Sequence, residues 1–200
     1  MRVGRVLFPI RELGPGQRLG LWVQGCERRC VGCANPELWE KDEKKEIPLP
    51  VLQLMAATAF SNSSLDGITI TGGEPMLQAK ELYQLLVSLK DVCRDVLVFT
   101  GYRYEDLQSM NDPDISALLS MISVLVDGEY IKELNAGARL RGSTNQRIIF
   151  LDDSKRIPYE NYIAADDRHI DSFLADHGVI SVGIHPQEFL DAFDQGKRNS

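Results

Sequence analysis

The sequence predicts an α/β fold built on a parallel sheet. Short runs rich in β-branched residues alternate with longer segments in which apolar residues recur at helical spacing. Such alternation favours parallel strands joined by right-handed crossovers. The chain has 200 residues, of which 44% are hydrophobic, so we expect one domain with a substantial core.

The first half of the chain begins this alternation. The first expected strand, 21–24, leads into a loop that carries three cysteines. The mixed-charge run 40–46 is interpreted as a solvated connector, and a helix is expected from 50 to 60. A β-branched strand at 66–71 and a leucine-rich helix at 76–89 follow.

The second half continues the pattern and then departs from it. Its expected elements are a strand at 96–99, a helix at 114–120, and strands at 123–126 and 146–151. The segments 169–174 and 179–184 flank an Asp-His-Gly sequence typical of a hairpin turn, and a short helix is expected at 187–194. We therefore expect a core domain at residues 1–160 with a small appendage, 161–200, packed on it.

Composition excludes several classes of protein. A net charge of −7 argues against a broad nucleic-acid-binding face. No apolar run is long enough for a membrane span, and the first residues do not form a signal peptide, so we expect a cytoplasmic protein. In that reducing compartment, clustered cysteines indicate metal ligands or catalysts before disulfides.

Cys26, Cys30 and Cys33 form a C-x3-C-x2-C motif without a fourth cysteine nearby. Three thiolates leave one iron of a cubane [4Fe–4S] cluster without a protein ligand, just as catalytic zinc sites keep one position open. An open position indicates chemistry rather than a scaffold. The cysteines alone leave a non-catalytic iron–sulfur or zinc-binding module as an alternative.

Several conspicuous residues are interpreted as structural. Cys93 has no partner motif and is expected to be a buried thiol. Trp22 alternates with its strand and is expected in the core. His169, His177 and His185 lack metal-ligand spacing and are interpreted as turn or surface residues.

Four expected strands end in unusual sequences. These are the cysteine loop, Gly72-Gly73-Glu74-Pro75, Thr100-Gly101-Tyr102 and Asp127-Gly128-Glu129. Because the C-terminal ends of parallel strands share one rim, we expect the four to meet at one cleft. In the Gly-Gly-Glu-Pro sequence, glycines allow close approach of a ligand, proline suits a first helical position, and Glu74 offers a carboxylate to an ammonium group. Taken alone, this sequence is more commonly a plain strand-to-helix turn.

The cysteine motif together with Gly-Gly-Glu-Pro resembles the radical S-adenosylmethionine (SAM) superfamily. The sequence Arg141-Gly142-Ser143-Thr144-Asn145-Gln146-Arg147 narrows the resemblance to activating enzymes of anaerobic (class III) ribonucleotide reductase. The resemblance implies a partial parallel (β/α)6-type barrel, with the C-terminal hairpin and helix as an appendage.

The resemblance also implies cofactors and the residues that hold them. Cys26, Cys30 and Cys33 would hold a [4Fe–4S] cluster, and the amino and carboxylate groups of SAM would chelate its open iron. The implied SAM-binding residues are Gly32, Gly72, Gly73, Glu74 and Pro75, with Thr100 and Asp127 as further contacts to SAM or a cation.

The implied reaction is reductive cleavage of SAM to a 5′-deoxyadenosyl radical, which then generates a glycyl radical on a partner enzyme, anaerobic ribonucleotide reductase. A flavodoxin- or ferredoxin-type protein would donate the electron. Arg28 and Arg29 are either solvated surface charges or a docking patch for that acidic donor. A radical SAM enzyme acting on another peptide or a small molecule is the alternative, which the residues after about 151 would suit.

Overall fold

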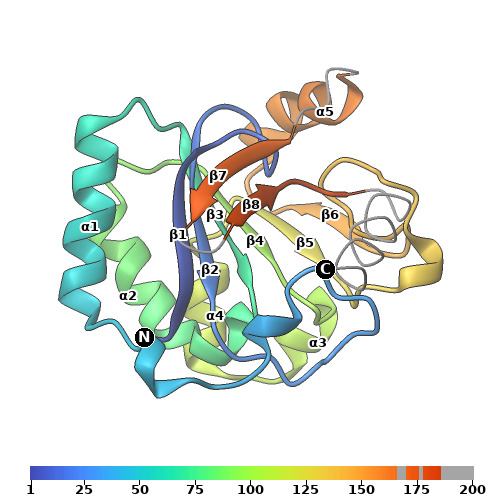
Figure 1. Cartoon of the computed structure of the whole chain (residues 1–200), viewed down its shortest axis with the longest axis horizontal. Coiled ribbons are helices and arrows are strands. Elements are labelled where there is room, and N and C mark those ends of the chain that lie inside the picture. Colours follow the sequence, from blue (N-terminus) through green and yellow to red (C-terminus); the bar gives the residue numbers. More distant parts are fainter. Residues whose placement is uncertain (166–169, 176–177, 186–200) are drawn as a thin grey trace.

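The computed structural model describes residues 1–165, 170–175 and 178–185. Within them, one sheet has the strand order β1-β2-β3-β4-β5-β6, and a separate hairpin pairs β7 with β8 (Figure 1). The strands are β1 Val3–Ile10, β2 Arg18–Val23, β3 Gly67–Gly72, β4 Val96–Phe99, β5 Val124–Asp127, β6 Arg147–Phe150, β7 Asp171–Ala175 and β8 Gly178–Val182.

The central sheet is mainly parallel, which confirms the α/β class, but both of its edge strands run antiparallel. Strands β2 to β5 are parallel neighbours, whereas β1 pairs antiparallel with β2 and β6 pairs antiparallel with β5. The expected direction of the strand at 146–151 is therefore wrong. Parallel neighbours need a crossover connection, usually an α-helix, whereas antiparallel neighbours do not. Segment 128–146, which joins β5 to β6, accordingly contains a 3-10 turn, Lys132–Leu134, and no α-helix.

Five α-helices lie in the described part of the chain. They are α1 Leu49–Asn62, α2 Ala79–Leu89, α3 Tyr104–Ser109, α4 Pro113–Leu119 and α5 Arg156–Ala164. The helices expected near 50–60, 76–89 and 114–120 are present, with a 3-10 turn at Pro75–Gln78 before α2. None of the described helices combines the length and the apolar character needed to cross a bilayer.

The two faces of the sheet are covered differently. On one face, Leu21, Ile70 and Val98 belong to a buried cluster that includes residues of α1, α2 and α4. On the other face, Leu97 and Val124 pack with Tyr159 of α5. Alternation of side chains along each strand produces this division.

The expected pairing of the hairpin strands is confirmed, and the hairpin is tied to the body of the protein. The carboxylate Oδ2 of Asp171 accepts hydrogen bonds from the backbone N–H groups of Arg11 at 2.6 Å and Glu12 at 3.2 Å. Val182 is buried in a cluster with Trp22, whose expected place in the core is confirmed. Figure 1 shows β7 and β8 lying away from α1 and α2. The helix expected at 187–194 lies outside the described residues, as do His169 and His177.

A buried polar network lies at the N-terminal ends of the parallel strands. Arg18, the first residue of β2, is completely buried. Its Nε donates to Thr69 Oγ1 at 2.7 Å and its Nη1 donates to Asp95 Oδ2 at 2.8 Å. The hydroxyl of Tyr159 donates to the other oxygen of Asp95 at 2.9 Å, which ties α5 to the sheet.

Candidate functional site

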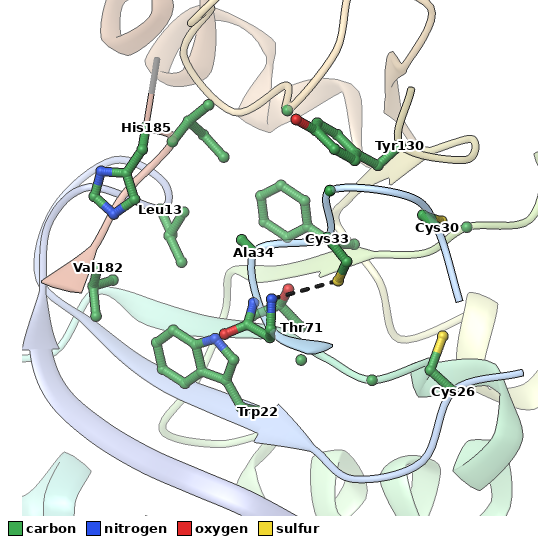
Figure 2. Close-up of a pocket in the computed structure, with 18 of the residues that line it drawn as sticks. Leu13, Trp22, Cys26, Cys30, Cys33, Ala34, Thr71, Tyr130, Val182 and His185 are labelled. Carbon is green, nitrogen blue, oxygen red and sulfur yellow. Dashed lines mark hydrogen bonds between the residues drawn. The ribbon is translucent and has the colours of Figure 1, made fainter. Parts of the chain in front are cut away.

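The loops after β2, β3, β4 and β5 meet at one cavity of about 510 Å³, as the strand-end argument predicts. Residues expected in the site that line it are Cys26, Cys30, Gly32, Cys33, Gly72, Gly73, Glu74 and Thr100. Figure 2 shows Cys26, Cys30 and Cys33 toward one side of the cavity and Val182 and His185 on the opposite side. Segments far apart in the sequence therefore line one cavity.

Backbone hydrogen bonds fix the two ends of the cysteine loop. At its start, Gly25 N–H donates to Leu38 O and Cys26 N–H donates to Trp39 O, both at 2.8 Å. Cys33 N–H donates to Cys30 O at 3.2 Å and closes a turn between these two cysteines. The intervening residues belong to no helix or strand, so the thiols sit on a loop that is held at its base.

The glycine turn after β3 is fastened directly to this loop. Gly73 N–H donates to Val23 O and Glu74 N–H donates to Gly25 O, both at 2.8 Å. A Cβ atom on Gly73 would lie 2.3 Å from the Gly25 carbonyl oxygen, which is far inside contact distance. Position 73 therefore requires glycine, because any side chain would separate the turn from the cysteine loop.

Burial favours the protonated form of the Cys30 and Cys33 thiols. Burial raises the pKa of Cys30, whose Sγ donates to Glu129 Oε1 at 3.7 Å. Burial also raises the pKa of Cys33, although the Asn35 N–H, which donates to its Sγ at 3.4 Å, acts in the opposite direction. Binding of a metal must therefore displace protons from these sulfurs.

Among the residues that the structure describes, no three Cys, His, Asp or Glu side chains converge closely enough to hold a metal ion. The donor set nevertheless fits a cluster with one open iron, since three thiols of one loop line the cavity. The indole N–H of Trp39 is buried and makes no hydrogen bond of ordinary geometry in the described part of the chain, but it lies near Cys33 and lowers the pKa of that thiol against the larger effect of burial. Such a donor suits a sulfur acceptor.

Glu74 lies inside the protein rather than at the mouth of the cavity. Its side-chain Oε1 accepts from Met76 N–H at 3.0 Å and from the Thr100 hydroxyl at 2.8 Å, and its Oε2 accepts from Gly101 N–H at 2.8 Å. Burial raises its pKa, and these hydrogen bonds oppose that shift. The carboxylate therefore ties the glycine turn to the end of β4.

Two other expected site residues do not line the cavity. Pro75 is buried as the first residue of its 3-10 turn, the helical position predicted for it. Asp127 is fully buried, accepts from Tyr104 N–H at 2.9 Å and from Arg147 Nε at 3.0 Å, and pairs with Arg103 at 3.5 Å. The structure thus places Asp127 in an arginine-lined network beside the cavity.

Sequence reasoning missed several residues of the cavity wall. His185, interpreted as a turn or surface residue, lines the cavity together with the hairpin segment 179–184. Its Nε2 lies 3.1 Å from Ser181 Oγ, and its carbonyl oxygen accepts from Asn135 Nδ2 at 3.2 Å. Burial lowers the pKa of this imidazole. No local signal reveals these positions, since they depend on how the hairpin packs.

The two arginines of the cysteine loop also differ from each other. Arg28 lines the cavity, and its guanidinium carbon lies 4.2 Å from the ring centroid of Tyr102. Arg29 is exposed and pairs with Glu40 at 2.6 Å. Only Arg29 is oriented as expected for a solvated surface charge.

Comparisons with known proteins agree with this geometry. A family model described as "4Fe-4S single cluster domain" matches residues 13–149. The chain is similar to the anaerobic ribonucleoside-triphosphate reductase-activating protein of Enterobacteria phage T4, with 33% identity over 139 residues that make up 68% of this chain and 85% of the relative. The corresponding protein of Vibrio cholerae is 34% identical over 148 residues, covering 70% of this chain and 93% of the relative.

More distant similarities cover less of the chain. The pyruvate formate-lyase-activating enzyme of Staphylococcus aureus is 37% identical over 81 residues, which are 39% of this chain and 32% of that enzyme. A crystal structure of QueE from Escherichia coli is 19% identical, covers 50% of this chain and 52% of that one, and has a TM-score of 0.39. The hairpin lies beyond the residues matched by the family model.

Proposed function

Because the chain belongs to the family of anaerobic ribonucleoside-triphosphate reductase-activating proteins, we propose that it installs a glycyl radical on an anaerobic ribonucleotide reductase. It is a radical SAM enzyme whose cofactors are a [4Fe–4S] cluster and SAM. One observation carries the proposal. The glycine turn is hydrogen-bonded to Gly25 at the start of the three-cysteine loop, and both segments line one cavity.

The residues of the site have distinct roles in this proposal. Cys26, Cys30 and Cys33 would hold three irons of the cluster and leave the fourth without a protein ligand. When bound, the cluster supplies one electron for cleavage of SAM to methionine and a 5′-deoxyadenosyl radical, which takes a hydrogen atom from a glycine Cα of the partner. The chain's own residues bind and orient SAM and exclude water from the cavity.

The SAM-binding residues divide by how they act. Gly32, Gly72 and Gly73 line the cavity and permit close approach of SAM to the backbone. Glu74 and Thr100 also line the cavity, and their mutual hydrogen bond holds the glycine turn in place. For Pro75 and Asp127 we propose positioning roles, since neither lines the cavity; Pro75 starts the 3-10 turn and Asp127 anchors the loop that leads to Gly128.

We further propose the barrel type, the domain boundaries, the electron donor and the compartment of this enzyme. The sheet is the parallel part of a (β/α)6-type barrel, residues 1–160 form its core domain, and 161–200 form an appendage packed on that core. A flavodoxin- or ferredoxin-type protein reduces the cluster. The enzyme works in the cytoplasm, where its four free cysteines remain reduced.

The first experiment measures SAM cleavage. Protein reconstituted anaerobically with iron and sulfide and reduced with dithionite is expected to convert SAM to 5′-deoxyadenosine. The Cys30→Ala variant should lose this activity, because only two thiols of the loop remain. Cys93→Ala is the matched control, since Cys93 is buried outside the cavity, and it should retain cluster and activity. Unchanged turnover in Cys30→Ala would exclude the proposed cluster site.

The second experiment identifies the substrate. Incubation with SAM and an anaerobic ribonucleotide reductase from the same source should produce the doublet EPR signal of a glycyl radical on the reductase. The hairpin that lines the cavity beyond the family match favours a second candidate, the same chemistry on another peptide or a small molecule. Cleavage of SAM without a glycyl radical on the reductase would favour that candidate.

A further inference from the structure

Arg28 occupies an unusual position for a charged residue of an exposed loop. It lines the cavity together with the cysteines on either side of it, Cys26 and Cys30. Its guanidinium stacks on Tyr102, and its Cδ and Nε would lie 3.1 Å and 3.2 Å from a Cβ on Gly101. Contacts with an aromatic ring and a backbone segment fix the direction of this side chain.

The guanidinium of Arg28 forms no hydrogen bond or ion pair with another residue in the described ranges 1–165, 170–175 and 178–185. This distinguishes it from its neighbour Arg29, which pairs with Glu40. The Glu74 carboxylate interacts electrostatically with Arg28, but its oxygens already accept hydrogen bonds from three other donors. A guanidinium offers five N–H donors in a planar fork that matches a carboxylate. In a chain of net charge −7, a cation that lines a cavity without a hydrogen-bonded or ion-paired carboxylate points to an anionic ligand.

The chemistry of SAM identifies that ligand. The carboxylate is the only anionic group of SAM. Its amino group is protonated at neutral pH, and its sulfonium carries a positive charge at every pH. The open iron of the cluster takes oxygen and nitrogen donors, which SAM carries at its amino-acid end. That end must therefore lie beside the cysteine loop, where Arg28 is the cavity-lining arginine between two cluster ligands.

Resting on the proposed function, we propose that Arg28 binds the carboxylate of SAM. Its fork holds the carboxylate beside the open iron, and Tyr102 keeps the fork in position. The positive charge also offsets the negative charge that three thiolates and a carboxylate bring into one cavity. Arg28 is thus a binding and orienting residue of the site, not part of a docking patch for an electron donor.

The test compares SAM with decarboxylated SAM, which keeps the sulfonium and the amine but lacks the carboxylate. Dissociation constants are measured by equilibrium dialysis against cluster-loaded wild type, Arg28→Gln and Arg29→Gln. Arg29→Gln is the matched control, because it removes the same charge at the adjacent, exposed position. Iron and sulfide content and the EPR spectrum of the reduced cluster establish that each variant carries the same cluster.

Arg28→Gln should weaken SAM binding about tenfold or more, because a hydrogen bond to a charged group is lost, while binding of the decarboxylated compound stays unchanged. Arg29→Gln should keep the wild-type preference for SAM. If Arg28→Gln fails to load its cluster, Arg28→Lys retains the charge without the fork and should still lose part of the preference.

Two results would overturn the inference. The first is that Arg28→Gln prefers SAM over decarboxylated SAM as strongly as the wild type does. If Arg28→Gln does not take up its cluster, the same result in Arg28→Lys would count. The other is an equal loss in Arg29→Gln, which would indicate net charge instead of a contact. Either result leaves SAM cleavage by the wild type intact, so it is distinguishable from failure of the proposed function, in which the wild type forms no 5′-deoxyadenosine.

Discussion

At the scale of single residues, the two kinds of cysteine in this chain have opposite requirements. Cys30 and Cys33 must lose their protons to bind iron, and their exposure to the cavity permits this. Cys93 is only 7% exposed, and its thiol donates to the Asp95 carbonyl at 3.6 Å. Burial raises the pKa of Cys93 above 9.0, whereas the Asp95 backbone and Arg18 act in the other direction.

This shift predicts how stability depends on pH. The folded protein binds the Cys93 proton more tightly than the unfolded chain, so this contribution is complete below the unfolded pKa of 9.0 and disappears as pH rises through the folded value. The urea midpoint of the apo-protein should fall as pH rises above 9.0, and it should fall less in Cys93→Ala. Equal falls in both proteins would contradict a raised pKa at this thiol.

At the scale of elements, the hairpin β7–β8 both packs against the core and lines the cavity. Its inner residue Val182 is 2% exposed and packs with Trp22 and Leu13, whereas the segment 179–185 lines the cavity. The outer residue Leu174 is 93% exposed. The hairpin thus belongs to the core on one side and to the wall of the site on another.

We expect Val182→Ala to lower the free energy of unfolding by about 2 kcal/mol, because two buried methyl groups are lost and a small cavity is left. Val179→Ala is the control of identical chemistry; Val179 is 60% exposed, and its replacement should change stability by less than about 0.5 kcal/mol. Chemical denaturation measures both. If Val179→Ala lowered the free energy of unfolding as much as Val182→Ala, the hairpin would not pack as described.

The central elements could be predicted from the sequence because each carries a strong local signal. Buried parallel strands such as 96–99 are continuous apolar runs, and α2 has leucines at helical spacing. The edge strand β1 is mostly half-buried and contains Pro9, so its signal is weak. Helix α3 has only six residues, too few for a periodicity to be recognised.

The candidate site was predictable to a similar degree. Its cysteines and glycines follow strands in recognisable motifs, so their convergence follows from the rule on strand ends. The inward direction of Arg28 and the place of His185 depend on contacts with Tyr102 and Asn135, which are distant in sequence. Glu74 shows the same limit, since its residue type suggested a ligand contact, but its three hydrogen-bond donors come from the fold.

At the scale of the whole molecule, the two ends of the parallel strands have different tasks. The cavity lies at the C-terminal ends, whereas the network of Arg18, Asp95 and Tyr159 lies at the N-terminal ends. Removing one partner of such a buried pair leaves an uncompensated charge, which costs far more than the pair itself contributes.

Arg18→Met should therefore destabilise the protein by about 3–5 kcal/mol, because Asp95 is left buried without its cation. Arg94→Met is the control, since Arg94 is exposed and its loss should cost less than about 0.5 kcal/mol. The dissociation constant for SAM, measured on the folded fraction, should be the same in both variants. A changed constant in Arg18→Met would mean that the two ends of the sheet are coupled.

The peptide group of Gly25 connects the cysteine loop to the glycine turn. It accepts a hydrogen bond from Glu74 N–H and lies in close contact with Gly73. Occupation of one half of the cavity therefore helps to order the other. Thermodynamic reciprocity then requires that the factor by which the iron–sulfur group tightens nucleoside binding is also the factor by which the nucleoside tightens binding of the iron–sulfur group. At equilibrium with a chelator, the enzyme should therefore retain the most metal when its cosubstrate is abundant.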